Sequence, residues 1–154
     1  MPQAGYWYSS INSSYQIGLH GFYAAQIGGS VGSFYNGTRK TFSVSSGYLS
    51  VNRFLAFEPG MSLNWIDLPD GAFTSQLVSN RTIVTPSPRM LISSLSQFNA
   101  ALHSLSTSVR LNWEYRPSSQ LFLVYSDGRD TLASGFPSVM NRSIAVKVTR
   151  LLRF

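Results

Sequence analysis

The residues of this chain that could carry acid–base or nucleophilic chemistry are few and poorly placed for it. Only two histidines, His20 and His103, titrate near neutral pH. His103 directly precedes Ser104, and neighbouring residues of an extended chain point apart, so a Ser–His pair would need a serine from elsewhere. The chain has no cysteine, which excludes a thiol nucleophile and thiolate metal ligands. We therefore predict that the protein is not an enzyme.

Motifs that could bind an ion or a phosphate group are equally weak. Asp127 and Asp130 in "SDGRDT" offer the oxygen ligands that calcium prefers, but a turn stabilised by Asp and Gly explains the segment better. Gly28, Gly29 and Gly32 have the composition of a phosphate-binding loop, yet no helix follows to point amide groups at a phosphate. The sequence thus predicts no metal and no cofactor.

The composition is unusual for a water-soluble domain. Charged residues make up 12% of the chain, compared with roughly 25% in an average soluble domain, whereas aromatic residues reach 14%. The net charge of +6 comes from arginines and lysines scattered along the chain, which argues against a nucleic-acid partner. No apolar run approaches the length of a transmembrane helix, so any membrane span must be made of strands.

The last residues, "NRSIAVKVTRLLRF", alternate between apolar and polar side chains. Such alternation predicts a β-strand that separates an apolar medium from a polar one. Arg150 departs from the pattern, although near a membrane rim its long side chain could reach the headgroups. The final aromatic residue and the preceding alternation resemble the C-terminal signal that the barrel-assembly machinery reads in outer-membrane barrels. The residues of this predicted assembly signal are Ile144, Val146, Val148, Leu152 and Phe154.

Similar alternation recurs upstream and predicts further β-strands. It is clearest in residues 105–115 and recurs in 55–65, where Pro59 suggests a bulge, while the faces of 73–84 cannot be assigned. Turn signals such as Asn-Gly and Asp-Gly separate about nine strands of membrane-spanning length. We predict an all-β chain, an antiparallel up-and-down meander forming a transmembrane β-barrel or the C-terminal part of one, with residues 1–154 as a single β-barrel domain.

The alternation also predicts which side chains face which medium. Charges are costly in lipid, so four are expected to face the lumen: Glu58, Arg110, Glu114 and Lys147. Aromatic residues favour both membrane interfaces, and the expected girdle consists of Tyr48, Trp65, Trp113, Tyr115 and Tyr125. If Phe154 lies on the periplasmic side, turn parity places Asp67, Asp70, Asp127 and Asp130 outside and Arg53, Arg89, Arg116 and Arg153 at the periplasmic rim.

Several segments resemble one family along most of the chain from about residue 32 onward. They include "GSFYNGTRKTFSV", "DLPDGAFTSQLV", "SPRMLISSLSQFNA" and "SVRLNWEYRPSSQLFLVYSDGRDT", followed by the C-terminal strand. They look like the C-terminal outer-membrane barrel of a family of uncharacterised bacterial proteins that carry an N-terminal carbohydrate-binding-like sandwich domain. The resemblance implies a β-barrel in the bacterial outer membrane, and it supplies architecture rather than an activity.

Two main functions remain open from the sequence, and an outer-membrane hydrolase is a third, less favoured option. In the first, the chain is the C-terminal segment of an outer-membrane barrel that acts as a membrane anchor and as a channel for small solutes. Its expected partners are the lipid bilayer, the barrel-assembly machinery and the missing N-terminal domain. The start, "MPQAGYWYSS", shows no signal peptide, so we expect a fragment of a longer protein. In the alternative, the chain is a soluble β-barrel or sandwich that binds a small apolar ligand.

Overall fold

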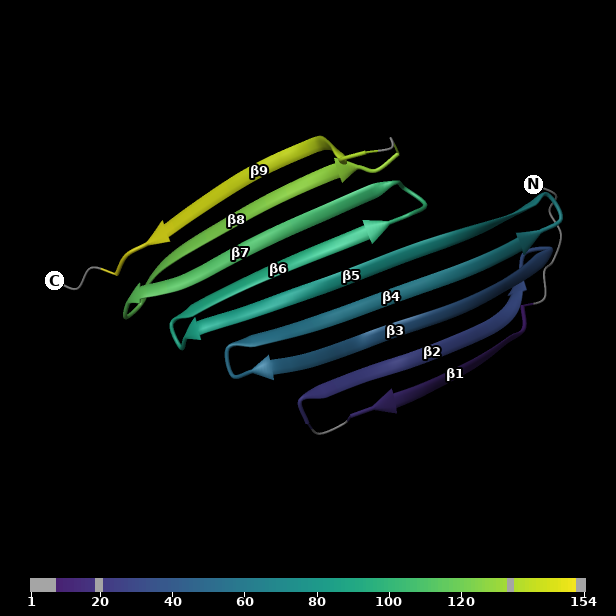
Figure 1. Cartoon of the computed structure of the whole chain (residues 1–154), viewed down its shortest axis with the longest axis horizontal. Helices are drawn as coiled ribbons and strands as arrows, with labels where there is room; N and C mark the ends of the chain where they lie inside the picture. Colours follow the sequence, from purple (N-terminus) through teal and green to yellow (C-terminus); the bar gives the residue numbers. More distant parts are fainter. Residues whose placement is uncertain (1–7, 19–20, 133–134, 152–154) are drawn as a thin grey trace.

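A computed structural model describes residues 8–18, 21–132 and 135–151 of the chain. Each strand in this part pairs with the next one along the sequence, and the strands form one antiparallel sheet (Figure 1). This confirms the predicted all-β antiparallel meander. No helix in the described part is long and apolar enough to cross a membrane. The strands are β1 (Ser10–Ile17), β2 (Tyr23–Phe34), β3 (Gly37–Asn52), β4 (Leu55–Leu68), β5 (Gly71–Ser87), β6 (Met90–Asn99), β7 (Ser104–Arg116), β8 (Ser119–Asp130) and β9 (Ser138–Thr149).

Short turns join the strands and divide the sheet into two ends. The turns after β3, β5 and β7 contain Arg53, Arg89 and Pro117 and lie at one end, which we call the arginine end. The turns after β2, β4, β6 and β8 lie at the other, the aspartate end, with Asp67, Asp70, Asp127 and Asp130 close to them. The described part therefore separates the two sets of charged residues as turn parity predicts, while Arg153 lies outside it.

The pairing register assigns each side chain to one face, because directly paired residues point to the same side of a sheet. We call the two sides the apolar face and the polar face. A continuous row on the apolar face crosses seven strands and consists of Tyr15, Ile27, Val44, Met61, Val78, Phe98 and Leu105. A row on the polar face consists of Asn12, Ser30, Thr41, Asn64 and Ser75. Thr41 Oγ1 donates to Asn64 Oδ1 over 2.9 Å within that row.

A bulge changes the expected facing of one strand. Pro59 interrupts the β3–β4 ladder, as predicted, whereas the β4–β5 register continues past it without a shift. The extra residue lies in β3, between Val44 and Leu49. There Gly47 lies so close to Pro59 that a Cβ atom at position 47 would overlap the Pro59 carbonyl. Because Pro59 has no N–H to offer, the adjoining strand bulges beside it, and only glycine fits that approach.

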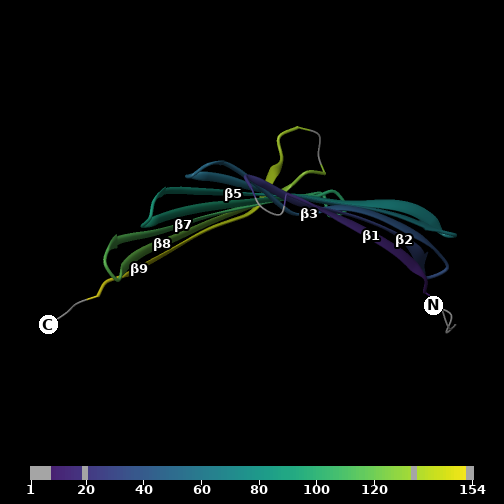
Figure 2. The ribbon, with the colours of Figure 1, turned by 90° about the horizontal axis from the view of Figure 1, so that it is seen from below.

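The sheet has almost no core of its own. Ala56 and Ile66 are the only buried hydrophobic residues in the described part, and each retains 9% exposure. Viewed along its edge, the sheet forms a shallow arch (Figure 2). β1 and β9 lie at opposite margins and do not pair with each other, so the described strands form an open sheet. Such a sheet is consistent with an up-and-down β-barrel or with part of one.

The missing core leads to a prediction about solvent. In plain buffer we expect the isolated chain to aggregate, because its apolar rows exceed the few hundred Å² of continuous apolar surface that a soluble monomer tolerates. In detergent micelles or lipid bilayers it should fold, which circular dichroism and analytical ultracentrifugation can follow. A monodisperse protein that unfolds cooperatively in detergent-free buffer would refute membrane insertion.

Candidate membrane surface and polar face

The four charges predicted to face a lumen, Glu58, Arg110, Glu114 and Lys147, all lie on the polar face. The register places Glu58 opposite Arg81, Arg110 opposite Ser93, Glu114 opposite Gln120 and Lys147 opposite Phe122. They come from strands β4, β7 and β9, and the structure does not gather them into one cluster. They therefore share a surface and do not form a single site.

The contacts of these charges differ. A Glu58 carboxylate oxygen lies 3.5 Å from a guanidinium nitrogen of Arg81. Glu114 Oε1 accepts a hydrogen bond of 2.9 Å from the Ser118 backbone N–H, which stabilises the tight turn between β7 and β8. Arg110 and Lys147 have no hydrogen-bond or ion-pair partner within the described residues. Both cations therefore lie on the polar face without an ion-pair partner in the described part.

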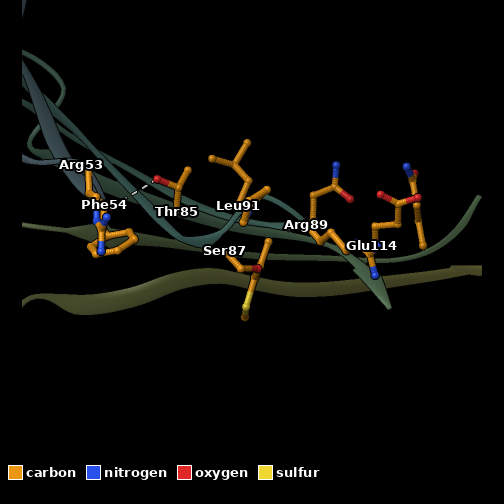
Figure 3. Close-up of a pocket in the computed structure, with 11 residues that line it drawn as sticks. Arg53, Phe54, Thr85, Ser87, Arg89, Leu91 and Glu114 are labelled. Carbon is orange, nitrogen blue, oxygen red and sulfur yellow. Dashed lines mark hydrogen bonds between the residues drawn. The ribbon is translucent and has the colours of Figure 1, made fainter. Parts of the chain in front are cut away.

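Hollows lie on both faces of the sheet, and most of them lie on the polar face. A hollow of about 490 Å³ at the arginine end is lined by Arg53, Thr85, Arg89 and Glu114 among others (Figure 3). The Arg53 guanidinium lies 4.5 Å from the centre of the Phe54 ring in that hollow. Two further hollows follow the same face along the sheet, and they share Arg81. A separate hollow near Trp65 lies mainly on the other face.

Four of the five predicted girdle residues lie on the apolar face, at two levels. Trp113 and Tyr115 are near the arginine end, with ring centres 6.2 Å apart, and the Tyr115 hydroxyl donates to the Thr149 carbonyl over 3.0 Å. Trp65 and Tyr125 are nearer the aspartate end. Trp65 and Trp113 are 44% and 42% exposed, so nothing in the described part covers either indole.

Tyr48 departs from the predicted girdle. The bulge in β3 pairs Tyr48 with Ala24, two residues from Gln26 on the polar face, whereas Leu49 joins Phe57 on the apolar face. Tyr48 therefore does not share a face with the other four predicted girdle residues. The physical reason is the extra residue beside Pro59, which reverses the alternation along β3.

The described part of the predicted assembly signal follows the expected alternation. Val148, Val146 and Ile144 pair with Leu121, Leu123 and Tyr125 on the apolar face. Val148, Val146 and Ile144 are 63%, 59% and 68% exposed. Their partners on β8 are less exposed, because β9 is an edge strand with a neighbour on one side only. Leu152 and Phe154 lie outside the described residues.

An ion-pair cluster that the sequence did not predict lies on the apolar face at the aspartate end. The Asp127 side chain is only 7% exposed, and its two carboxylate oxygens accept from the Nε atoms of Arg129 and Arg142, the latter over 2.9 Å. The Tyr125 hydroxyl donates to Asp127 over 3.4 Å. The Arg129 guanidinium lies 5.0 Å from the ring centre of Phe136 in the β8–β9 loop. This cluster ties β8, β9 and their loop together.

The aspartates and histidines considered above for metal binding or catalysis do not come together in the described part of the structure. Asp127 is engaged by arginines, whereas Asp130 accepts from the Leu132 N–H over 2.7 Å as a turn residue would. His103 lies in the β6–β7 turn with a φ of 47°, and its carbonyl accepts from the Thr131 N–H over 2.7 Å. His20 lies outside the described residues. Within the described part, no three His, Cys, Asp or Glu side chains converge as metal ligands would.

Comparison of the sequence and the fold with known proteins finds no match. No family model matches the chain, no curated protein matches it, and no solved structure matches its fold. The function must therefore be inferred from the surfaces described above.

The Asp127 cluster leads to a stability prediction. Asp127→Asn removes the charge that holds two arginines together, and we expect it to lower the free energy of unfolding more than the loss of a single exposed ion pair does. Glu58→Gln removes an exposed pair and should cost about 0–1 kcal/mol. Urea unfolding in detergent or lipid measures both. Equal losses of unfolding free energy in the two variants would show that the Asp127 cluster stabilises the fold no more than the exposed Glu58–Arg81 pair does.

Proposed function

We propose that the chain is the C-terminal segment of a bacterial outer-membrane β-barrel protein and anchors that protein in the membrane. The observation that carries the proposal is the apolar row that crosses seven strands on the face opposite Glu58, Arg110, Glu114 and Lys147. An apolar face next to lipid and a polar face toward a lumen are what a transmembrane barrel requires.

The position of the hollows supports this choice over a soluble barrel. In a soluble barrel or sandwich, the enclosed side is the apolar one, because burying it stabilises the fold. Here the hollows at Glu58, Arg81, Arg110 and Glu114 lie on the polar face, and one near Trp65 lies on the apolar face. The apolar side has no second layer in the described part, and Trp65 and Trp113 remain about half exposed there. Lipid is a medium that would cover such a face.

Strand and loop dimensions also support the proposal. Every strand from β2 to β9 has at least 10 residues, enough for a tilted strand to cross a bilayer. The longest connection, residues 131–137, follows β8 at the aspartate end; at the arginine end the turns after β3, β5 and β7 are tight, and the connection after β1, residues 18–22, is shorter than the β8–β9 loop. Outer-membrane barrels keep short turns in the periplasm and longer loops outside. We therefore assign the arginine end to the periplasm.

Closure of the barrel requires strands beyond those described. β1 and β9 run in the same direction, so an antiparallel ladder between them needs an odd number of further strands. This fits the interpretation of the chain as part of a longer barrel, with the barrel-assembly machinery as the partner that reads the strand ending in Phe154. We propose that the barrel anchors a carbohydrate-binding-like domain of the same protein to the membrane.

The polar face extends the proposal to a channel for small solutes. Arg110 and Lys147 have no ion-pair partner in the described part, and both project from strands that would line the lumen. Unpaired cations beside a polar path would favour anionic solutes. The alternative, a soluble barrel or sandwich that binds a small apolar ligand, is separated from the membrane proposal by the two measurements below.

Adjacent residues on β7 test the facing. Leu111 lies on the apolar face and Asn112 on the polar face, both near the middle of the strand. Leu111→Arg should cost about 2–4 kcal/mol in unfolding free energy if it enters the bilayer midplane, whereas Asn112→Arg should stay hydrated and cost much less. Urea unfolding of both variants in lipid vesicles provides the measurement. Equal tolerance would mean that the faces are wrongly assigned.

Quenching of Trp113 tests the medium. With the other two tryptophans replaced by phenylalanine, we expect brominated lipid to quench Trp113 fluorescence strongly, because this indole lies on the apolar face and is 42% exposed. A water-soluble quencher serves as the control and should act weakly. An unquenched Trp113 in a folded sample would show that this face meets a protein core, in favour of the soluble alternative.

A further inference from the structure

One hollow of the polar face lies between two arginines that come from different strands. Arg81 of β5 and Arg110 of β7 both line it, together with Ser93 and Ser108, and its volume is about 250 Å³. The register explains this space, because Arg110 pairs with the small Ser93, while Leu95 separates Arg81 from Ser108 in the next row. We call this space the Arg81–Arg110 hollow.

Arg110 brings a guanidinium group without a partner to the hollow. It is exposed, and it makes no ion pair or hydrogen bond within the described residues. A guanidinium presents five N–H donors in a rigid fork, a geometry that matches the oxygens of a carboxylate or a phosphate group. An anion that enters the hollow therefore meets donors that no protein group occupies.

Arg81 is paired only loosely and also keeps donors for a ligand. Its Nη1 lies 3.5 Å from Glu58 Oε2, which is longer than the about 2.7–2.9 Å of a charge-assisted hydrogen bond. The Arg81 side chain is 51% exposed. Glu58 lines the adjoining hollow and not this one, whereas Arg81 lines both. Glu58 therefore does not separate Arg81 from the space beside Arg110.

The neighbouring hollows of the polar face add positive charge. Successive hollows share lining residues, so they follow one another along the face. Both carboxylates that line them already have a partner, since Glu58 faces Arg81 and Glu114 accepts from the Ser118 N–H. An excess of cations along a groove attracts anions. The cations of these hollows are Arg53, Arg81, Arg89, Arg110 and Lys147.

We propose that the Arg81–Arg110 hollow binds the phosphate group of a small organic phosphate, an inference that rests on the proposed channel, in which the polar face lines the lumen. A phosphate group carries three acceptor oxygens and nearly two negative charges at neutral pH. Because these oxygens point in different directions, the group can accept from guanidiniums on two strands and from the Ser93 hydroxyl together. A planar carboxylate presents one edge, which a single guanidinium fork satisfies.

The rest of the lining indicates what the phosphate group is attached to. Ile83, Leu91 and Leu95 line the same hollow and lie on the polar face beside the serines. These side chains offer contacts to carbon and no hydrogen bonds. A short carbon skeleton that carries one phosphate group can therefore use both parts of the lining, whereas inorganic phosphate can use only the arginines and serines.

Calorimetric titration of the folded protein in detergent micelles at 0.15 M salt tests the site with defined probes. We expect butyl phosphate to bind about tenfold more tightly than butyrate, and several-fold more tightly than inorganic phosphate. Arg110→Gln should weaken the binding of butyl phosphate by about tenfold, as the loss of a hydrogen bond to a charged group does. Arg81→Gln should weaken it several-fold, because Glu58 already draws on that guanidinium.

Lys147→Gln provides the matched control. It removes the same charge from the same face, but Lys147 lies on β9 and lines a different hollow. Exposed charges farther apart than the Debye length, about 8 Å at this salt concentration, are largely screened. The affinity for butyl phosphate should therefore change less than twofold. Arg81, Arg110 and Lys147 are all exposed, so circular dichroism should show a folded sheet in each variant.

The outcomes distinguish this inference from the proposed function. Equal weakening by Arg110→Gln and Lys147→Gln, equal affinity for butyrate, or no binding of butyl phosphate to the parent would overturn the phosphate site, even if brominated lipid quenches Trp113. Absence of Trp113 quenching would overturn the membrane location, whatever the affinity for butyl phosphate. Selective weakening at Arg81 and Arg110, together with preference for the phosphate probe, supports the site.

Discussion

The structure depends on a sheet that satisfies its backbone within its own plane and leaves its apolar face without a protein layer. Antiparallel pairing from β1 to β9 uses the N–H and C=O groups of the interior strands. Packing does not supplement that pairing, since no side chain in the described part is fully buried. In water such a sheet would expose its apolar rows, and hydrophobic burial would favour association. At the proposed membrane location, lipid would supply the apolar contacts that a core supplies in a soluble domain.

The same constraint explains why the two sheet margins matter. Edge strands carry unpaired N–H and C=O groups, which are solvated in water but costly in lipid. Because β1 and β9 run in the same direction, neither can complete an antiparallel ladder with the other, and a second copy in the same membrane orientation meets the same difficulty. Closure at the edges therefore needs strands that run the opposite way.

Alternation along the sequence predicted much of this arrangement, because a strand of period two with one apolar side has only one favourable facing. It predicted the split of residues 105–115 and the shared face of Arg110 and Glu114. It failed at Tyr48, since a bulge caused by Pro59 on the neighbouring strand is a pairwise effect that β3 alone does not encode. It also missed the contact between Asp127 and Arg142, because only the β8–β9 register brings residues across that loop together.

The polar residues of the apolar face clarify where a membrane would begin and end. On β4 the apolar residues extend from Leu55 to Trp65, and the next residue on that face is Asp67. On β8 they extend to Tyr125, and the next is Asp127, which two arginines neutralise. In both strands an aromatic residue is the last one before the first carboxylate, as expected where hydrocarbon gives way to headgroups. Thr107 of β7 pairs directly with Asp127, and Ser96 and Asn80 continue the same row across β6 and β5, so these polar side chains on the apolar face are continuous with the charged cluster.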